Sequence, residues 1–510
     1  MTNPTTHREI ERKFRVHALF EWPDLSGLDS QVVFHPTVSM RAIYHDTSEL
    51  TLFRWNVTLR RREGGHDAGW HLKLPVESLA EGVRDELQVA LNAGEVGQVP
   101  AELADIITPL VRDLPLVPVV ELRTERSPRV MSSTTGKPLV EIVDDVVTVV
   151  DLNGIAVGIF RELEIELLDN DDPQALAIME VVSGLLVDAG AIPGTMSKAA
   201  SALGPRASAP ADVPDLPMPG PSGMAVDAIR STIAHQVRAL IFADIAVRRN
   251  LPDSVHQVRV AARRLRSNLR TFDSLLDHEW AFTLEEELAW LADEMGMIRD
   301  SEVLEERLLK HANDLHPHDA DLAMNAIRTH LDRRIETARA GAMAALRSDR
   351  HTYLIEDLVQ AARAPRMVDI AYQSCEVIFP PLIEHSWKVL AKSCGQLKIN
   401  GPATEWHRAR IKAKRARYAV DVVVPIFGIQ AKKFAKSLAE VTELLGEHQD
   451  AFVAQEFLRE LAGSSDVDAP TGFALGLLHG IELEYEMHDR YTFTDIWDKA
   501  RKSAQHSGLV

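Results

Sequence analysis

Charged residues at every second position most restrict how the first part of this chain can fold. In "REIERKF", residues 8–14, a β-strand would place Glu9, Glu11 and Lys13 on one face, whereas a helix would scatter them around its axis. The same spacing recurs in later segments that are rich in β-forming residues. Its members are Arg60 and Arg62, His71 and Lys73, Arg84 and Glu86, Glu141 and Asp145, and Glu162, Glu164 and Glu166.

Strands with one charged face need a structure that accommodates the charges, because burying an unpaired ion costs several kcal/mol. A solvated edge strand would explain a single E-x-E-x-K sequence, but it does not explain so many strands of this kind. A closed antiparallel barrel, apolar outside and lined inside by both signs of charge, explains all of them. Its carboxylates could hold hard divalent cations, and its Arg and Lys side chains could hold phosphate oxygens.

A Pro-, Ala- and Gly-rich segment, "GPRASAPADVPDLPMPGPSG", divides the chain of 510 residues and is predicted to be a linker over residues 204–223. We therefore expect one domain over residues 1–203 and another over 224–500. In the first, β-like runs at 139–151 and 155–168 flank Asn153-Gly154, a strong hairpin signal. In the second, apolar residues recur at helical spacing with breaks near 316–318, 400–404 and 463–472, which predicts an all-helical fold.

Charge and cysteine content restrict the class of protein. The formal charge is -19, with 19 Lys and Arg against 33 Asp and Glu in residues 1–220, and 37 against 42 in residues 221–510. General attraction to nucleic acid is therefore not expected. No run of 18 apolar residues and no apolar leader is present, and the two cysteines, Cys375 and Cys394, lie in a segment expected to be helical. These features predict a cytoplasmic protein without a membrane span, a disulfide framework or a zinc site; the sequence sets no oligomeric state.

The helical part repeats itself. "VHQVRVAARRLRSNLRTF" begins at Val255 and "WHRARIKAKRARYAVDVV" begins at Trp406; in both, basic residues follow a histidine at offsets 3, 7, 8 and 10. Further along, "LAWLADEMGMIRD" at 288–300 aligns with "LAEVTELLGEHQD" at 438–450. Two matched signals at about the same separation indicate a duplicated unit, with repeats over about 224–345 and 370–500.

The first domain resembles the CYTH domain, the fold of the triphosphate tunnel metalloenzymes. "EIERKF" is similar to the family's E-x-E-x-K sequence, and "YHDT", "LRRR", "LKLP", "VRDE", "VEIVDD", "ELEIEL" and "SKAA" follow in the family's order. The resemblance implies an eight-stranded antiparallel β-barrel whose tunnel binds triphosphate and a divalent metal, Mg²⁺ with Mn²⁺ as the alternative. The whole chain is then a multidomain α+β protein, in which the tunnel barrel precedes an all-α domain of duplicated four-helix bundles.

The resemblance also implies roles for individual residues. The expected metal ligands are Glu9, Glu11, Asp145, Glu162 and Glu164, and the expected catalytic residues are Glu11 and Lys13. Triphosphate contacts are expected from Arg60, Arg62, Lys73, Arg84, Arg123, Arg126 and Lys198.

Some positions of the first domain keep alternatives. Arg123 and Arg126 have opposite strand parity, so without a β-bulge only one of them can face the tunnel. His71 stands where the family pattern suggests a small polar residue, and for His45 and His71 we favour a surface or hydrogen-bonded role. Glu166 is equally well read as a partner of a tunnel arginine or as a metal contact.

The combination of basic and acidic residues suits phosphoryl chemistry. Arg and Lys would orient a triphosphate, and metal ions or a glutamate would position and deprotonate water. No residue of this domain is identified as a contact for a base or sugar. Inorganic triphosphate is therefore the leading substrate, and Mg²⁺-dependent inorganic triphosphatase activity is the leading activity. Thiamine triphosphate hydrolysis and cyclisation of ATP belong to the same family and stay open, as does a non-catalytic polyphosphate-binding protein.

The second domain resembles the CHAD domain, a helical family that often follows CYTH. The resemblance implies polyphosphate binding by the two basic helices, and with it an association with polyphosphate granules as an extension of the cytoplasmic location. The expected ligands are His256, Arg259, Arg263, Arg264, Arg266, His407, Arg410, Lys414, Arg415 and Arg417. Asp300 and Asp450 match between the repeats, and either orient the basic residues by ion pairing or cap a helix.

Overall fold

The computed structural model describes residues 5–25, 28, 31–76, 83–194 and 196–510. The expected absence of an apolar leader refers in part to residues 1–4, which lie outside the described residues. The chain divides into two compact units, Met1–Asp212 and Val213–Val510. The domain bounds expected from the sequence stay predictions beside this division.

Eight strands of the first unit form a closed antiparallel barrel. They are β1 (Thr5–Val16), β3 (Val38–Asp46), β4 (Thr58–Glu63), β5 (Gly69–Pro75), β6 (Val83–Ala90), β7 (Val117–Ser132), β8 (Pro138–Val150) and β9 (Ala156–Leu167). Their order around the ring is β1-β6-β5-β4-β3-β7-β8-β9, and the pairing of β9 with β1 closes it. The predicted eight-stranded barrel is confirmed; the short strands β2 (Gln31–Phe34) and β10 (Ile192–Gly194) pair with β7 and β1 outside the ring.

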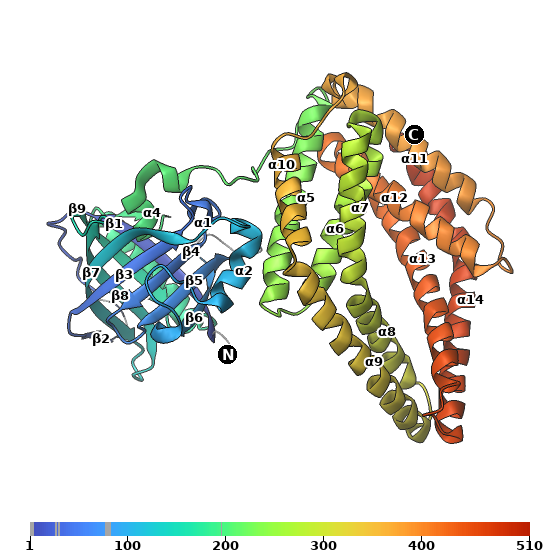
Figure 1. The fold of residues 1–510 in the computed structure, drawn as a ribbon, viewed down its shortest axis with the longest axis horizontal. Helices are drawn as coiled ribbons and strands as arrows, with labels where there is room; N and C mark the ends of the chain where they lie inside the picture. The colour runs from blue at the N-terminus through green and yellow to red at the C-terminus, as the bar shows by residue number, and fades with distance from the viewer. Residues whose placement is uncertain (1–4, 26–27, 29–30, 77–82, 195) are drawn as a thin grey trace. The chain divides into compact units, whose positions relative to one another are not determined.

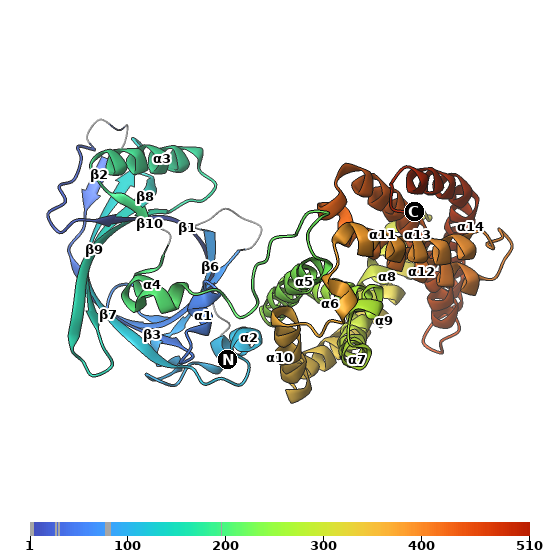
Figure 2. The ribbon, with the colours of Figure 1, turned by 90° about the horizontal axis from the view of Figure 1, so that it is seen from above.

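The period of two along each strand gives the barrel its two surfaces. Apolar side chains of β1, β8 and β9, such as Phe14, Ile142 and Ile165, point outward and pack under helix α3 (Pro173–Asp188). Gly154 takes the positive φ of the hairpin turn between β8 and β9, where Asn153-Gly154 predicted one. Figure 2 looks along the bore and shows α3 outside the ring of strands.

Short helices complete the first unit. Helices α1 (Thr51–Arg54) and α2 (Ala101–Val111) follow β3 and β6, with the 3-10 turn η1 (Leu91–Ala93) between β6 and α2. Helix α4 (Lys198–Leu203), followed by η2 (Gly204–Ser208), packs Ala199 and Ala200 against Tyr44 and Val149. The bore is therefore filled by apolar side chains at one part of its length and is charged at another.

The second unit is built from helices in the described residues. They are α5 (Ala225–Arg248), α6 (Ser254–Thr271), α7 (His278–Glu294), α8 (Gly296–Ala312), α9 (Pro317–Leu346), α10 (Asp349–Arg363), α11 (Cys375–Cys394), α12 (Ala403–Phe427), α13 (Ile429–Ala462) and α14 (Ala469–Gln505), with short turns η3 (Asp273–Leu275) and η4 (Asp369–Tyr372). The all-helical prediction is confirmed, and the expected breaks fall between α8 and α9, α11 and α12, and α13 and α14.

The duplication is visible in the helix order (Figure 1). Helices α5 and α6 correspond to α11 and α12, while α7 and α8 correspond to the single long helix α13, and α9 and α10 to α14. A cluster of buried apolar side chains joins the two repeats where α8 and α9 meet α13 and α14, around Leu308, Ile327 and Leu478. Cys375 and Cys394 are both free and buried at the ends of α11. No described helix has the length and apolarity to cross a membrane.

Candidate functional site

The charged part of the bore is a pocket with a volume of about 280 Å³. Basic and acidic side chains from most of the barrel strands share its wall. The basic residues are Lys13, Arg60, Arg62, Lys73, Arg84, Arg126 and Lys198, and the acidic residues are Glu9, Glu11, Asp67, Glu86, Glu141, Glu164 and Glu166. Strand parity predicted most of this wall, because residues two apart on a strand face the same side.

Strand β1 supplies the three residues of the E-x-E-x-K sequence to this pocket. Lys13 Nζ lies 2.9 Å from Glu11 Oε1, and Glu9 is ion-paired with Lys73 of β5. Burial alone would raise the pKa of Glu11, but Lys13 and Lys73 hold it below its ordinary value. Glu11 is therefore ionised at neutral pH, which allows it to hold a cation or to accept a proton.

The acidic strand β9 faces the lysines from the other side. Glu164 lies 2.6 Å from Lys198 Nζ, 3.0 Å from Arg126 Nη2 and 3.5 Å from Lys13 Nζ. Although burial opposes it, these cations hold the pKa of Glu164 well below its ordinary value. Lys198, at the first turn of α4, thus links the helix to the acidic strand.

Asp145 and Glu162 are buried beside this cluster but are not among the described residues that line the pocket. Arg126 donates to both oxygens of Asp145, at 2.9 and 2.7 Å, and Lys198 Nζ lies 3.0 Å from Asp145 Oδ2. The structure thus brings Asp145 to the cluster as the partner of two cations.

Several carboxylates of the cluster are buried so deeply that their cationic neighbours do not offset the cost of ionising them. Burial raises the pKa of Glu9 to about 8 and that of Glu166 to about 7, and it also raises the pKa of Glu162. Glu162 Oε1 is buried without a hydrogen-bond partner among the described residues, its nearest cation being Lys198 at 3.6 Å. The site would be stabilised by additional positive charge.

This electrostatic imbalance fits a hard divalent cation, since the available donors are carboxylate oxygens. Within the described residues no group of three Asp, Glu, His or Cys side chains is already arranged to hold an ion. The carboxylates point instead to Lys13, Lys73, Arg126 and Lys198. A cation would therefore have to displace lysine and arginine side chains, which would then be available to bind phosphate oxygens.

The arginines of β4 and β6 also line the pocket, and Arg84 of β6 lies in register with Glu9 of β1. Arg60 Nη2 lies 3.5 Å from Glu86 Oε1, and Arg84 donates to Asn56 Oδ1 at 2.7 Å. Arg62 is ion-paired with Asp67. Arg60 also hydrogen-bonds the Tyr44 phenol; although burial opposes it, this cation holds the pKa of Tyr44 below its ordinary value. Tyr44, which packs in the barrel wall, thus also touches a phosphate-binding candidate.

Of the two alternatives on β7, the structure places Arg126 inside and Arg123 outside. The register between β7 and its neighbours is regular from Arg123 to Arg126, so their opposite parity is kept. The Arg123 side chain is 57% exposed and pairs with Glu121. The expectation that Arg123 binds substrate is therefore corrected.

Two histidines of the barrel are buried, not on its surface. His71 Nδ1 lies 2.9 Å from Glu86 Oε1, and its Nε2 lies 2.9 Å from the Asp67 carbonyl oxygen; His45 Nε2 accepts from Gly97 N–H at 3.1 Å. Burial lowers the pKa of each histidine to about 4. His71 therefore orients Glu86, a pocket carboxylate whose strand pattern was recognised in the sequence but which received no role.

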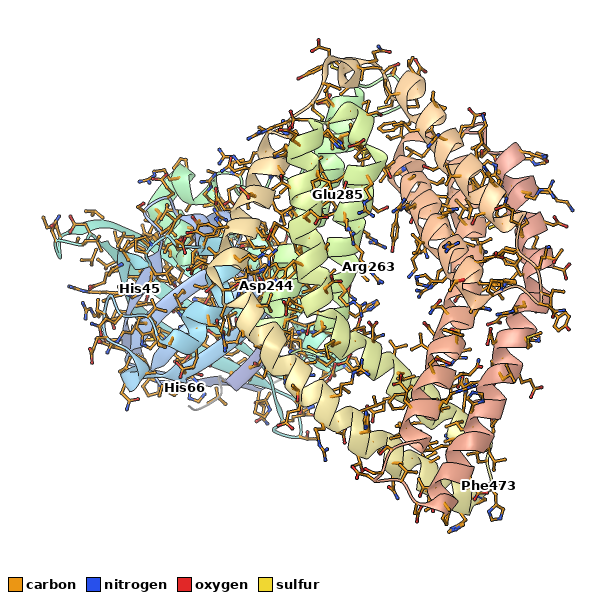
Figure 3. The ribbon with its side chains drawn as sticks, turned by 45° about the vertical axis from the view of Figure 1, so that its right-hand side comes forward. His45, His66, Asp244, Arg263, Glu285 and Phe473 are labelled. Carbon is orange, nitrogen blue, oxygen red and sulfur yellow. The ribbon has the colours of Figure 1, made fainter. Side chains whose placement is uncertain are left out.

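The basic helices α6 and α12 lie side by side in the second unit, and their cations crowd one another. Burial and the neighbouring Arg410, Arg263 and Arg259 lower the pKa of Lys414 to about 7. Burial likewise lowers the pKa of Arg263, which lies on the side of α6 that faces the second repeat (Figure 3). These four residues form one cationic cluster, as the repeated spacing predicted they could.

The remaining basic residues lie on either side of that cluster. Arg266 and Arg415 lie close enough to interact, together with Arg270. Arg264 and Arg417 line a separate cavity beside α5. His256 is next to Arg299, while His407 hydrogen-bonds Gln449 Oε1 at 2.8 Å. The equivalent histidines thus have different partners at matching positions of α8 and α13.

Of the two roles expected for Asp300 and Asp450, ion pairing and helix capping, the structure shows ion pairing. Arg259 Nη1 lies 2.7 Å from Asp300 Oδ1, and Arg410 Nη2 lies 3.8 Å from Asp450 Oδ1. Both aspartates lie within helices and neither occupies an N-cap position. Each therefore orients the equivalent arginine of its own repeat.

Comparison with known proteins gives matches to both units. Residues 7–189 match the CYTH domain and residues 231–459 match the CHAD domain. The uncharacterized protein Rv2226 of Mycobacterium tuberculosis is 33% identical over 513 residues, which covers 94% of each chain. This likeness extends through both units.

Solved structures resemble part of the chain at lower identity. PptA from Streptomyces chartreusis is 21% identical, covers 54% of this chain and 100% of its own, and gives a TM-score of 0.47. The CHAD domain from the plant Ricinus communis is 24% identical, covers 56% of this chain and 94% of its own, and gives a TM-score of 0.46. Both TM-scores lie below 0.5, so neither structure indicates an activity for this chain.

Proposed function

Since the chain belongs to the CYTH–CHAD family, we propose that its barrel hydrolyses inorganic triphosphate with a bound Mg²⁺ or Mn²⁺ ion, and that its helical domain binds polyphosphate. The observation that supports the hydrolase most directly is the pocket in the bore. Seven Lys and Arg side chains share one wall with seven carboxylates, and no apolar substrate body would fit that lining.

The residues of the pocket divide the work between them. Arg60, Arg62 and Arg84, together with Arg126 and Lys198, bind and orient the phosphate oxygens once released from their carboxylate partners. Glu9, Glu11, Glu162 and Glu164 are the proposed metal ligands, with Asp145 as a further one. A divalent ion held by these residues would neutralise phosphate charge and lower the pKa of water. Glu11 accepts the proton of the attacking water, and Lys13 keeps Glu11 ionised and in place.

A second candidate substrate is an organic triphosphate, such as thiamine triphosphate or ATP. It is favoured by a cavity of about 560 Å³ that adjoins the charged pocket and shares Glu11, Lys13 and Arg84 with it. Phe14, Val187 and Pro193 give this cavity an apolar side that could receive the organic group.

The helical domain contributes binding in this proposal. The cluster of Arg259, Arg263, Arg410 and Lys414 attracts a linear polyanion locally, although the overall charge of the chain is -19. The other basic residues of α6 and α12 extend this surface. The protein is proposed to be cytoplasmic and to associate with polyphosphate granules.

The barrel proposal is tested by a substrate panel. Phosphate release from tripolyphosphate, thiamine triphosphate and ATP should be measured with Mg²⁺, with Mn²⁺ and with chelator, and cyclic AMP should be followed in parallel. We expect tripolyphosphate to give the highest kcat/KM and chelator to abolish turnover. Binding without turnover of any substrate would contradict the hydrolase and favour the non-catalytic polyphosphate-binding protein.

The helical-domain proposal has its own test. The charge reversals Arg263→Glu and Lys414→Glu, one in each repeat, should each weaken binding of long-chain polyphosphate at fixed ionic strength. Their combined effect should be non-additive, since both residues act on one shared ligand. A folded double variant that binds as tightly as the parent would contradict the proposal.

A further inference from the structure

The second unit contains a cavity of about 570 Å³ whose Arg264 and Arg417 belong to the proposed polyphosphate surface, whereas its other lining residues have no part in that surface. Helices α5, α6 and α12 form its walls, together with Leu216 and Met218 from the segment ahead of α5. Ser231 holds that segment by donating to the Leu216 carbonyl at 2.8 Å. Cavities of this size commonly bury most of a small organic ligand.

Two arginines from different helices meet at this cavity. Arg264 comes from α6 and Arg417 from α12, with Asp421 of α12 between them. Arg417 donates to Thr442 Oγ1 at 3.1 Å, and its Nε lies 3.6 Å from Asp421 Oδ2. That Nε is buried without a hydrogen bond among the described residues. With Asp421 ionised the three side chains carry one net positive charge, which suits a single phosphate better than a long polyanion.

A buried amide also faces the cavity without a partner. Asn268 of α6 is 3% exposed, and its side chain makes no hydrogen bond to any residue that the structure describes. Its amide has two donors and one acceptor, which can pair with the polar edge of a ligand.

The rest of the wall is suited to a flat, partly apolar body. Tyr418 presents an aromatic side chain beside Arg417, and Met218, Val422 and Pro425 supply apolar surface. An anion without such a body, such as inorganic phosphate, would leave this surface uncovered.

The internal duplication shows that these features are not a by-product of the repeat. By the register that aligns His256 with His407, Asn268 corresponds to Ala419 and Tyr418 to Ser267. On the corresponding side of the α6–α12 pair, Arg270 is instead ion-paired with Glu285. Only one of the two related positions therefore combines an amide, an aromatic ring and two arginines.

We propose that the cavity between α5, α6 and α12 binds a small organic phosphate, a phosphate group on a planar, hydrogen-bonding body, as in a mononucleotide. The phosphate contacts Arg264 and Arg417, and the planar body packs on Tyr418 and hydrogen-bonds Asn268. This site is distinct from the cluster of Arg259, Arg263, Arg410 and Lys414, and its existence does not depend on the proposed function of that cluster.

The test is calorimetric titration of the full-length protein with AMP, GMP, CMP and UMP, and with adenosine and inorganic phosphate as partial ligands. At least one mononucleotide should bind more tightly than either partial ligand. Asn268→Ala should weaken that nucleotide by about fivefold, the effect of one hydrogen bond, without changing the binding of inorganic phosphate. Asp421→Asn removes a negative charge beside the phosphate and should tighten the nucleotide severalfold while leaving adenosine unchanged.

Two matched variants separate this site from others. Arg408→Ala replaces an exposed arginine of α12 outside the cavity, and Arg60→Ala removes an arginine of the barrel pocket; neither should change nucleotide binding here. The proposal is overturned if no mononucleotide binds with a Kd below about 1 mM, the upper end of ordinary substrate levels. It is also overturned if Asn268→Ala and Asp421→Asn, both folded by circular dichroism, bind nucleotide like the parent. Long-chain polyphosphate binding should be unchanged in Asn268→Ala, so failure of this site and failure of the polyphosphate proposal give different results.

Discussion

At the scale of single residues, the barrel is governed by which buried charges find a partner. Two or more cations hold the pKa values of Glu11 and Glu164 low, whereas at Glu9 and Glu166 burial outweighs Lys73 and raises the pKa. Carboxylates that line one pocket thus differ in pKa. The chemistry of the pocket depends on these differences and not on the number of charges alone.

Replacing Glu11 by Gln keeps the shape of the side chain and removes its charge. We expect metal-dependent phosphate release to fall about a hundredfold, since the loss of one such electrostatic contact costs about 3 kcal/mol. Glu125→Gln is the matched control, because Glu125 is exposed on β7 and lines neither cavity of the barrel. A Glu11→Gln variant that turned over at the parent rate with saturating Mg²⁺ would show that the pocket is not the catalytic site.

The three consecutive arginines of β4 provide a second comparison. Arg60→Ala and Arg62→Ala should raise KM for triphosphate more than Arg61→Ala, because Arg60 and Arg62 line the pocket. Arg61 faces the other side, where it pairs with Glu63 and is only 10% exposed. Its replacement should therefore lower the melting temperature without a comparable change in KM. Equal KM effects at all three positions would contradict the proposed orientation of β4.

At the scale of elements, the helical unit is held together by buried polar pairs as well as by apolar contacts. Asp244 of α5 pairs with Arg248 of the same helix and with His351 of α10, each at 2.7 Å, inside the first repeat (Figure 3). A comparable pair joins His311 of α8 to Glu482 of α14 at 2.7 Å. These pairs fix how one helix packs against another.

Asp244→Ala should destabilise the helical unit by about 3–5 kcal/mol, because it removes the buried carboxylate that pairs with both Arg248 and His351. The change should appear as a lower melting temperature of one transition in calorimetry. Glu384→Ala, which breaks the exposed pair of Glu384 with Lys388, should cost less than about 0.5 kcal/mol. Similar effects of both variants would mean that the Asp244 pair contributes nothing beyond a surface ion pair.

The α6–α12 pair also predicts a pH dependence of polyphosphate binding. Burial and three arginines lower the pKa of Lys414 to about 7 in the free protein, and a bound polyanion must raise that pKa. Below pH 7 Lys414 is already charged, so the affinity should be constant there. Above pH 7 binding must take up a proton, so the affinity should fall as the pH rises from 7 to 9.

The variant Lys414→Arg is the control for this dependence, because a guanidinium does not lose its proton in this range. Affinity should be measured at constant ionic strength from pH 6 to 9. The variant should show a flatter profile than the parent above pH 7. Parallel profiles would assign the pH dependence to another group.

At the scale of the whole molecule, the boundary between the two units lies where neighbouring residues hydrogen-bond to different units. Asp212 accepts hydrogen bonds from Trp55 and Arg112 of the first unit, whereas the carbonyl of Val213 accepts from Arg238 of the second at 2.9 Å. Adjacent residues of the chain therefore belong to different cores. Each unit contains its own buried apolar residues.

The fragment of residues 213–510 should therefore fold alone and bind long-chain polyphosphate without hydrolysing tripolyphosphate. Its affinity should fall steeply with added salt, because a linear polyanion releases condensed counterions when Arg and Lys neutralise it. Circular dichroism and a salt series of binding measurements check both statements. A fragment that folds but hydrolyses tripolyphosphate would place catalysis outside the barrel.

The sequence by itself determined the fold class and most of the barrel wall, because two local periods carry that information. Alternation along strands put Glu9, Glu11 and Lys13 on one face, and helical spacing with internal repetition identified α6 and α12. Strand parity also indicated that only one of Arg123 and Arg126 faces the bore, but it did not decide which one.

Only the tertiary structure decided which charges meet, because contacts between strands and helices distant in the chain depend on register and packing. The register of β7 turned Arg126, and not Arg123, to the bore, and closure of β9 on β1 set Lys13 opposite Glu164. Packing of α5 against α6 and α12 likewise produced the cavity around Asn268, an asparagine with no distinguishing local pattern. Local sequence encodes the direction of a side chain within its own element, while its neighbours are fixed by the assembly of all elements.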